Sequence, residues 1–318
     1  MCYDLIGDVH GHSEPLRALL ERLGYERLVG VYRHPERRAV FLGDFIDRGP
    51  DQRGVIEIVR PMIESGSALS VMGNHEFNAI GYATPAPDGS GHLRAHTDKN
   101  ENQHQAFLDA YLPGSREHRD LIAWFRSLPL WLDLGPIRVV HACWDPGSMS
   151  FLRGLLSADN RLTDDLMVEA FTAGCAAYQA VETLLKGKEV TLPEGSSFHD
   201  KDGHERHEIR IRWWDNNAST YRGAFMGPES ARTHIPEDAL GVGHELGYGH
   251  EEPPVFVGHY WLEGAPAPLA RNVACLDYSV AKPGGKLAAY RWSGETELSA
   301  ANFVTVGSGT VGAPDASG

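Results

Sequence analysis

Five short segments of the chain place aspartate, histidine or asparagine side chains directly after an apolar run. They are GDVHG at 7–11, GDFIDRG at 43–49, GNHE at 73–76, VVHA at 139–142 and VFVGH at 255–259. Together they supply six candidate metal ligands: Asp8, His10, Asp44, Asn74, His141 and His259. Mixed oxygen and nitrogen donors suit Mn, Fe or Zn better than Ca. One carboxylate can bridge two ions about 3.5–4 Å apart, so the set predicts a two-metal hydrolase that directs water at phosphorus.

Taken singly, each segment has a simpler interpretation. An Asp-x-His pair in a loop is more often a turn residue beside a solvated imidazole, and Asn74 would serve equally as a helix cap. The segments gain weight jointly, because each follows a strand-like run. Ligand sites in open α/β sheets form at the carboxyl ends of the strands, so five such loops can converge on one rim.

The first half of the chain alternates strand, loop and helix, whereas residues 147–250 show a less regular pattern. Apolar runs predict strands at 3–6, 39–42, 68–72, 130–134, 137–140, 255–257, 273–277 and 286–292. Apolar spacing and capping residues predict helices at 13–23, 51–61, 102–111, 116–125 and 164–185, with Pro61 kinking or ending the second. We expect one catalytic domain over 1–300, with a divergent insertion at 147–250, and a flexible tail at 301–318.

The composition is that of an acidic globular protein. Lys plus Arg total 29 and Asp plus Glu total 43, so the formal net charge is −14. Nucleic acids and anionic membranes attract basic surfaces, so we expect stable binding to neither. Four scattered cysteines without CxxC spacing indicate neither a disulfide framework nor a zinc site. With no signal peptide and no membrane-length apolar run in view, we expect a cytoplasmic protein.

Three of the segments together form a longer signature. The motifs GDxHG, GDxxDRG and GNHE are intact, and their combination resembles the calcineurin-like metallophosphoesterases of the phosphoprotein-phosphatase branch. The segment ACLDYSVAKPGGKLAAYR at 274–291 resembles the strand, turn and strand that close the bacterial symmetrical diadenosine tetraphosphatases. Bacterial Ser/Thr phosphatases share the plain motifs. The resemblance implies an α/β (α+β) fold, a four-layer α/β/β/α sandwich of two sheets flanked by helices, with two metals at one edge.

The resemblance also implies a role for each ligand. Asp8, His10 and Asp44 would bind the first metal. Asp44, Asn74, His141 and His259 would bind the second, with Asp44 bridging. A hydroxide held between the metals would attack a phosphate ester or phosphoanhydride, and we expect Mn²⁺ first, with Fe or Zn as alternatives.

Further motif residues have roles beyond metal binding. His75 would protonate the leaving oxygen as general acid, and Asp47 would hold its ring and keep it charged. Arg48 would bind two phosphate oxygens, although a surface salt bridge is its simpler interpretation. Asn74 is a further phosphate-binding candidate. The family often supplies a second arginine between the two late histidines, for which Arg212 is the candidate, with Arg210 and Arg222 competing.

Several features leave alternatives open. Trp144, after the fourth motif, either narrows the pocket or packs in the core. His92, His96 and His104 are better explained by a solvated loop or helix face than by the cleft, and His244 and His250 by a flexible loop. The substrate is a phosphorylated small molecule, a nucleotide or a phosphoprotein. A protein Ser/Thr phosphatase, a non-catalytic metal-binding protein and a nucleic-acid end-processing enzyme are the alternative functions.

Overall fold

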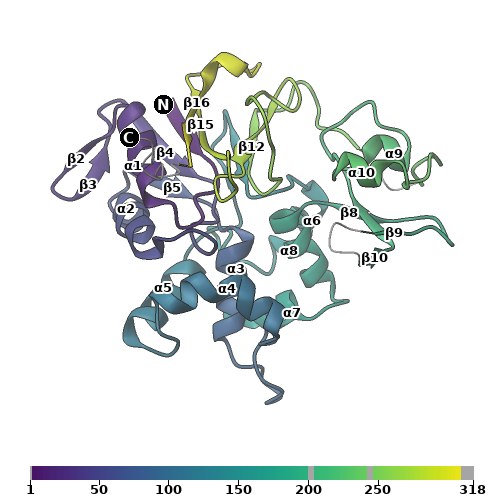
Figure 1. Cartoon of the computed structure of the whole chain (residues 1–318), viewed down its shortest axis with the longest axis horizontal. Helices are drawn as coiled ribbons and strands as arrows, with labels where there is room; N and C mark the ends of the chain where they lie inside the picture. Colours follow the sequence, from purple (N-terminus) through teal and green to yellow (C-terminus); the bar gives the residue numbers. More distant parts are fainter. Residues whose placement is uncertain (1, 200–203, 242–245, 309–318) are drawn as a thin grey trace, which may run out of the picture.

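The computed structural model describes residues 2–199, 204–241 and 246–308, and two β-sheets form its centre (Figure 1). The larger sheet has the order β14–β15–β1–β4–β5, and β16 pairs with β15 outside this path. Its strands are β1 (Cys2–Ile6), β4 (Arg37–Phe41), β5 (Ala68–Ser70), β14 (Asp277–Tyr278), β15 (Lys286–Trp292) and β16 (Phe303–Gly307). The smaller sheet has the order β13–β12–β7–β6. Its strands are β6 (Trp131–Asp133), β7 (Arg138–Val140), β12 (Val255–Val257) and β13 (Val273–Cys275).

The two sheets pack face to face because successive strand residues point to opposite sides. Leu5 and Val40 of the larger sheet share one buried cluster with Val139 and Phe256 of the smaller sheet. The neighbouring Ile6 points the other way and joins the cluster beneath the helices. The predicted β-sandwich is therefore confirmed, since side chains from two inner faces make a common core.

Helices cover the outer faces of the sandwich (Figure 1). Leucines of α1 and valines of α2 belong to the same buried cluster as the outward residues of the larger sheet, and residues of α8 join the outward valines of β12 in that cluster. This arrangement gives the four layers that the resemblance implied. The helices are α1 (Ser13–Arg22), α2 (Gln52–Glu64), α3 (Asn74–Ala83), α4 (Asp98–Ala110), α5 (Arg116–Arg126), α6 (Pro146–Leu152), α7 (Asp164–Phe171) and α8 (Ala176–Lys186).

The second half of the insertion forms a lobe at the right of Figure 1. Two antiparallel pairs, β8 (Glu189–Thr191) with β11 (Glu208–Arg210) and β9 (Phe198–His199) with β10 (Glu205–Arg206), lie beside two short helices. The helices are α9 (Tyr221–Ala224) and α10 (Glu229–Arg232). The lobe has its own apolar cluster, in which Val190, Ile209 and Phe225 are buried.

Several element predictions need correction. The helix expected over 164–185 is two helices, α7 and α8, because residues 172–175 leave the helical path and Gly174 has φ +88°. Pro61 does not end α2, which continues to Glu64. The run at 273–277 divides into β13 and the start of β14. A hairpin of β2 (Glu26–Leu28) and β3 (Val31–Arg33) was not expected.

The prediction of a flexible tail at 301–318 is wrong for its first residues, which are ordered. After a short 3₁₀ turn, η1 (Ala300–Asn302), β16 pairs antiparallel with β15 along five residues. The physical reason is that β15 would otherwise leave backbone donors and acceptors unpaired there. Residues 309–318 lie outside the described residues. A single catalytic domain over 1–300 stays a prediction.

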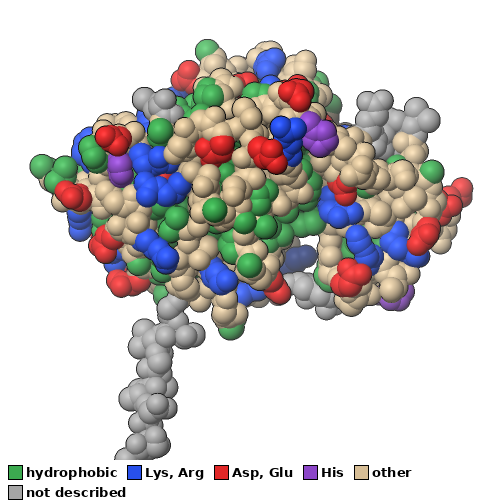
Figure 2. Space-filling model, turned by 90° about the horizontal axis from the view of Figure 1, so that it is seen from above, with side chains coloured by type: hydrophobic (Ala, Val, Ile, Leu, Met, Phe, Trp, Pro, Cys, Tyr) green, Lys and Arg blue, Asp and Glu red, His purple; other side chains and the backbone are tan. Residues whose placement is uncertain are grey.

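Charge and apolar surface are mixed on the exterior. On the face seen in Figure 2, acidic and basic side chains lie among one another rather than gathering by sign. Within the described residues, no helix has the length and apolar character needed to cross a bilayer. All four cysteines, Cys2, Cys143, Cys175 and Cys275, are described and are free thiols.

Candidate metal centre and catalytic site

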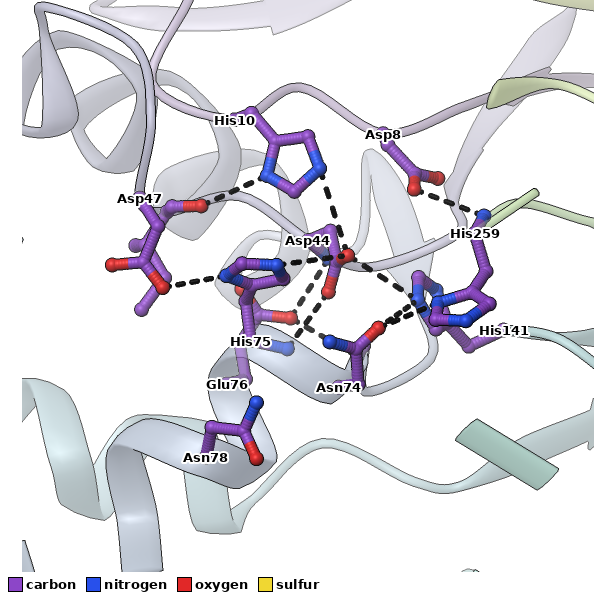
Figure 3. A network of polar contacts seen from close by, with 12 residues as sticks. Asp8, His10, Asp44, Asp47, Asn74, His75, Glu76, Asn78, His141 and His259 are labelled. Carbon is purple, nitrogen blue, oxygen red and sulfur yellow. Dashed lines mark hydrogen bonds and ion pairs between the residues drawn. The ribbon is translucent and has the colours of Figure 1, made fainter. Parts of the chain in front are cut away.

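The five motif segments meet at one edge of the sandwich (Figure 3). In the larger sheet, β1, β4 and β5 run parallel, and in the smaller sheet β7 and β12 do so. Loops after these strands carry Asp8, His10, Asp44, His141 and His259, and the sixth predicted ligand, Asn74, is the first residue of α3. The carboxyl ends of parallel strands lie at one edge, which explains the convergence expected from the sequence.

The Asp44 carboxylate lies at the centre of this group. Its Oδ2 atom is 3.3 Å from His141 Nε2, 3.7 Å from His10 Nε2 and 3.9 Å from His75 Nε2. Two sets of possible ligand atoms therefore share Asp44, and each set falls within 4.8 Å: His10, Asp44 and His75, and Asp44, His141 and His259. This sharing is the arrangement that a bridging carboxylate requires.

Asn74 and Asp8 complete the group. Asn74 Oδ1 is 2.7 Å from His259 Nδ1 and 3.1 Å from His141 Nε2. Asp8 Oδ2 accepts a hydrogen bond from the His259 backbone N–H at 3.0 Å.

Unsatisfied polar atoms show what this group lacks. Asp8 Oδ1, His10 Nε2 and His259 Nε2 are buried and have no hydrogen-bond partner among the described residues. Buried polar atoms normally have partners. The described side chains therefore fit divalent cations, which would accept these lone pairs.

The electrostatics of the group support the same interpretation. Burial and the neighbouring His75 lower the pKa of His10 to about 3, so its imidazole stays neutral and keeps the lone pair that a metal needs. Burial, followed by the charge of Asp277, raises the pKa of Asp8 well above its ordinary value. A carboxylate in such a position needs a nearby positive charge to remain ionised.

The backbone of the site is strained. Nine described residues other than glycine have positive φ. Six of them are site residues: His10, Asp44, Asp47, Arg48, His259 and Trp261. Such conformations cost free energy and persist only where surrounding contacts enforce them, which is typical of functional sites.

Glu76 provides part of this enforcement. Its carboxylate accepts hydrogen bonds from the backbone N–H groups of Asp44 at 2.8 Å, Phe45 at 2.8 Å and Gly73 at 3.0 Å. The side chain is fully buried and joins the turn after β4 to the start of α3. Sequence reasoning assigned Glu76 no role. The capping-box position three residues after Gly73 was the available signal.

His75 and Asp47 form the expected pair. His75 Nδ1 donates to Asp47 Oδ2 at 2.5 Å, which leaves Nε2 directed toward Asp44. Burial opposes a charged ring, but Asp44 and Asp47 outweigh it and raise the pKa of His75. The imidazolium that a general acid requires is thus favoured.

The structure adds His104 to this pair. His104 Nδ1 donates to Asp47 Oδ1 at 2.8 Å, and the ring is 5% exposed. Burial raises the pKa of Asp47, but the hydrogen bonds from His104 and His75 prevail and lower it to about 2. The solvated helix face preferred for His104 is therefore wrong. Its ring comes from α4, 57 residues away in sequence, so only the packing of that helix reveals it.

The two arginine candidates differ in their surroundings. Arg48 is exposed beside the site, and its guanidinium lies 4.2 Å above the Trp261 ring. Arg212 instead donates to the Gly223 carbonyl and pairs with Asp215 at 3.1 Å. Among the described residues it contacts none of the six ligands, so the choice of Arg212 is not supported.

Arg210 is better placed than Arg212. A β-carbon added to Gly187 would lie 3.2 Å from Arg210 Cδ and 2.9 Å from the hydroxyl of Tyr260, the residue after His259, so both side chains approach Gly187. Burial first, and then the charge of Arg210, lower the pKa of His259. Arg210 is therefore the insertion arginine whose charge acts on His259, and its guanidinium also pairs with Glu189 at 3.1 Å.

Comparison with known proteins agrees with this geometry. Residues 3–248 match the family of calcineurin-like phosphoesterases. The chain belongs to this family. Members of that family use divalent metal ions. This calcineurin-like phosphoesterase would hold them at the two groups of ligand atoms that share Asp44.

Curated relatives of this calcineurin-like phosphoesterase carry the name bis(5'-nucleosyl)-tetraphosphatase PrpE [asymmetrical]. The protein of Oceanobacillus iheyensis is 34% identical over 143 residues, which are 45% of this chain and 55% of that protein. The protein of Halalkalibacterium halodurans is 46% identical over 76 residues, or 24% and 31% of the two chains. The chain thus spans about a third to a half of these relatives' length. Both names say asymmetrical, whereas the segment 274–291 resembled symmetrical enzymes.

A solved structure shows the same fold. The protein serine/threonine phosphatase from Saccharomyces cerevisiae, described as similar to human phosphatase PP5, aligns with a TM-score of 0.50 and 16% identity. The alignment covers 99% of this chain and 82% of that chain.

The insertion is fastened to the two late ligands of the calcineurin-like centre. Trp213 Nε1 donates to the Ala142 carbonyl at 3.1 Å and to the Tyr260 hydroxyl at 3.0 Å. The Tyr260 hydroxyl donates in turn to Ala142 at 2.9 Å. Ala142 follows His141 and Tyr260 follows His259. The insertion at 147–250, whose sequence pattern is the least regular, therefore holds the residues next to His141 and His259 in position.

The remaining candidates lie apart from the centre. Trp144 is 6% exposed beneath the Arg138 guanidinium, which supports core packing. His92 stacks on His96, which in turn stacks on Tyr82 near the end of α3. His250 is exposed, and His244 lies outside the described residues.

Proposed function

We propose that this chain is a two-metal phosphoesterase that hydrolyses the phosphoanhydride chain of a dinucleoside polyphosphate. The observation that carries the proposal is the Asp44 carboxylate, shared by two sets of ligand atoms and lying 3.9 Å from the ring of His75. A shared carboxylate beside an imidazole whose pKa is raised is an arrangement suited to phosphoryl transfer to water.

Two sets of side chains would hold the metals. Asp8, His10 and Asp44 would bind one ion, and Asp44, Asn74, His141 and His259 the other. His75 Nε2 also falls within the first set, but the raised pKa of His75 favours the protonated ring, which has no lone pair for a metal, and the unpartnered Asp8 Oδ1 would supply a third ligand instead. Mn²⁺ is our first choice, with Fe or Zn as alternatives. When bound, the ions would activate water and offset negative charge on the phosphoryl oxygens.

The protein side chains perform the remaining steps. Arg48 would donate two N–H groups to oxygens of the attacked phosphate, because its guanidinium is exposed at the rim and has no carboxylate partner among the described residues. His75 Nε2 would give its proton to the leaving oxygen. Asp47 keeps the ring oriented and its charged form favoured.

The substrate class comes from the relatives. Their names specify bis(5'-nucleosyl) tetraphosphates, which supports a dinucleoside polyphosphate and asymmetrical cleavage here. A Ser/Thr phosphoprotein is the second candidate, favoured by the intact GDxHG, GDxxDRG and GNHE motifs. A nucleic-acid substrate is disfavoured by the net charge of −14. Four free thiols support the cytoplasmic location that we also propose.

The test is a substrate panel with Mn²⁺ added. It includes p-nitrophenyl phosphate, diadenosine tetraphosphate, a phosphopeptide and a phosphodiester. We expect hydrolysis of p-nitrophenyl phosphate and highest kcat/KM on diadenosine tetraphosphate. Asp44→Asn and His75→Asn should each remove at least about 99% of the activity, whereas Asp88→Asn, in an exposed loop, should be neutral. Full activity in both site variants would refute the two-metal assignment, and preference for the phosphopeptide would replace the substrate.

A further inference from the structure

Trp261 lies beside the metal centre and has no part in the function proposed above. It follows His259 by two residues, and its ring centroid is 5.5 Å from that of His10. Its φ of +53° is unusual for a bulky side chain. Its backbone N–H donates to Asp277 Oδ2 at 2.7 Å. The strained backbone is therefore held in place by a buried carboxylate, and the indole has a fixed position at the rim.

Two cations stack on this indole. The Arg48 guanidinium carbon is 4.2 Å from the ring centroid, and Lys282 Nζ is 5.1 Å from it. A cation that lies over an aromatic ring contacts the ring with one face only. The edge of the Arg48 guanidinium and the ammonium hydrogens of Lys282 can therefore still donate to an anion. Trp261 thus spaces two positive groups outward from the metal centre.

Neither cation is strongly engaged elsewhere. Arg48 has no ion pair among the residues that the structure describes. Lys282 pairs with Glu263 at 3.4 Å, and the two side chains are 44% and 78% exposed. An exposed pair of this kind contributes little free energy, so a phosphate can displace Glu263 from Lys282.

The turn that carries Lys282 is fixed to the same anchor as Trp261. Asp277 Oδ1 accepts from the Ser279 backbone N–H at 2.9 Å, and the Lys282 N–H donates to the Ser279 carbonyl at 2.8 Å. One buried carboxylate therefore holds both the indole and the start of the lysine turn. Such prior ordering lowers the entropy cost of binding a ligand.

A cavity of about 280 Å³ continues from this point. Its charged lining residues are Lys282, Lys286 and Glu263, which sum to a charge of +1. The chain as a whole carries −14. A polyanion is repelled by the net negative charge of the chain, but the positive groups from Arg48 to this cavity would attract it locally.

We propose that Arg48, Trp261 and Lys282 form a phosphate track, which binds the phosphates of a dinucleoside polyphosphate beyond the one attacked. Lys282 holds a distal phosphate, and Trp261 spaces it from Arg48. The proposal rests on the function proposed above and adds the residue by which a polyphosphate is distinguished from a simple phosphomonoester. No bond is made or broken at the track.

The experiment compares two substrates in the full-length protein with saturating Mn²⁺. One is diadenosine tetraphosphate, and the other is p-nitrophenyl phosphate, which has no distal phosphate. Lys282→Gln should raise KM for diadenosine tetraphosphate about tenfold, the usual cost of one charged contact, and lower the ratio of the two kcat/KM values by a similar factor. Lys282→Arg should restore the ratio because it keeps the charge. Lys99→Gln removes the same charge from an exposed position on α4 and should leave both substrates unchanged.

The outcomes separate the track from the activity itself. If Lys282→Gln leaves KM for diadenosine tetraphosphate unaltered, or lowers both kcat/KM values equally, the track is wrong and the proposed function stands. If the unaltered protein hydrolyses p-nitrophenyl phosphate but not diadenosine tetraphosphate, the substrate proposal is wrong and the track fails with it. If it hydrolyses neither, the two-metal activity is itself refuted.

Discussion

Replacing His104 by phenylalanine tests whether Asp47 needs two anchors to orient the general acid. Asp47 accepts from His75 at 2.5 Å and from His104 at 2.8 Å. The ring of His104 also stacks on Phe107, with centroids 4.7 Å apart. Phenylalanine keeps this stacking and removes the hydrogen bond to Asp47 together with the unpartnered Nε2 atom of the ring. The substitution therefore isolates one contact to the Asp47 carboxylate.

Two effects of opposite sign set the change in the free energy of unfolding that His104→Phe should cause. A hydrogen bond to a charged group contributes about 1.5–3 kcal/mol to stability. His104 Nε2 is buried without a partner among the described residues, and removing such an atom returns about 1 kcal/mol. The net loss in the free energy of unfolding is thus about 0.5–2 kcal/mol. The pKa of Asp47 should rise by about one unit, since about 1.4 kcal/mol corresponds to one unit.

The His104→Phe variant should lose part of its catalytic rate but remain active. Asp47 stays ionised at pH 7 even after such a rise from about 2, so His75 keeps its partner but is held less rigidly. We expect kcat on p-nitrophenyl phosphate to fall about tenfold, which corresponds to about 1.4 kcal/mol in the barrier. Metal content should not change, because His104 is not among the ligand sets.

A matched control exists in the same region. His118 is also 5% exposed and also contacts Phe107, with centroids 5.8 Å apart, but no carboxylate hydrogen bond is present on its ring among the described residues. His118→Phe should therefore leave kcat within about twofold of the unaltered protein. Steady-state kinetics, urea unfolding and metal analysis measure the three quantities. Equal kcat for His104→Phe and His118→Phe would show that the second anchor is irrelevant.

Three further predictions concern the acid pair and the thiols. His75→Asn should lower kcat by about 10²–10⁴ with metal content retained, as measured by kinetics and metal analysis; unchanged kcat would remove His75 as the acid. The folded-state pKa of Asp47, about 2, lies below its ordinary value of 3.8, so its ionised form stabilises the fold above pH 3.8, and that stabilisation is lost as pH falls through 2. In the metal-free protein, Asp47→Asn should accordingly reduce the change in the free energy of unfolding between these pH values, as measured by urea unfolding. An unaltered pH dependence would contradict the assignment. Burial raises the pKa values of the Cys143 and Cys275 thiols, so a thiol reagent should modify two cysteines rapidly in the native protein and four only after unfolding.

Local pattern was sufficient for much of the sandwich. The strands at 255–257 and 286–292 agree with β12 and β15 residue for residue, because a short apolar run between turn signals has few other solutions. The convergence of the six ligands was also predictable, since parallel strands present their carboxyl ends at one edge. The break between α7 and α8 was not, because the apolar spacing continues across Gly174 and tertiary packing decides where a helix stops.

The sequence by itself determined the chemistry at the ends of the strands. Motif residues lie within a few positions of a strand end, so the parallel pairing of β1, β4 and β5 brings Asp8, His10, Asp44, Asn74 and His75 to the same edge. Tertiary structure alone decided what surrounds them. His104 reaches Asp47 from α4, the charge of Arg210 rather than that of Arg212 acts on His259, and Lys282 meets Trp261 across a turn anchored by Asp277. The physical reason is that these contacts join segments far apart in sequence, whose approach depends on the packing of whole elements rather than on local pattern.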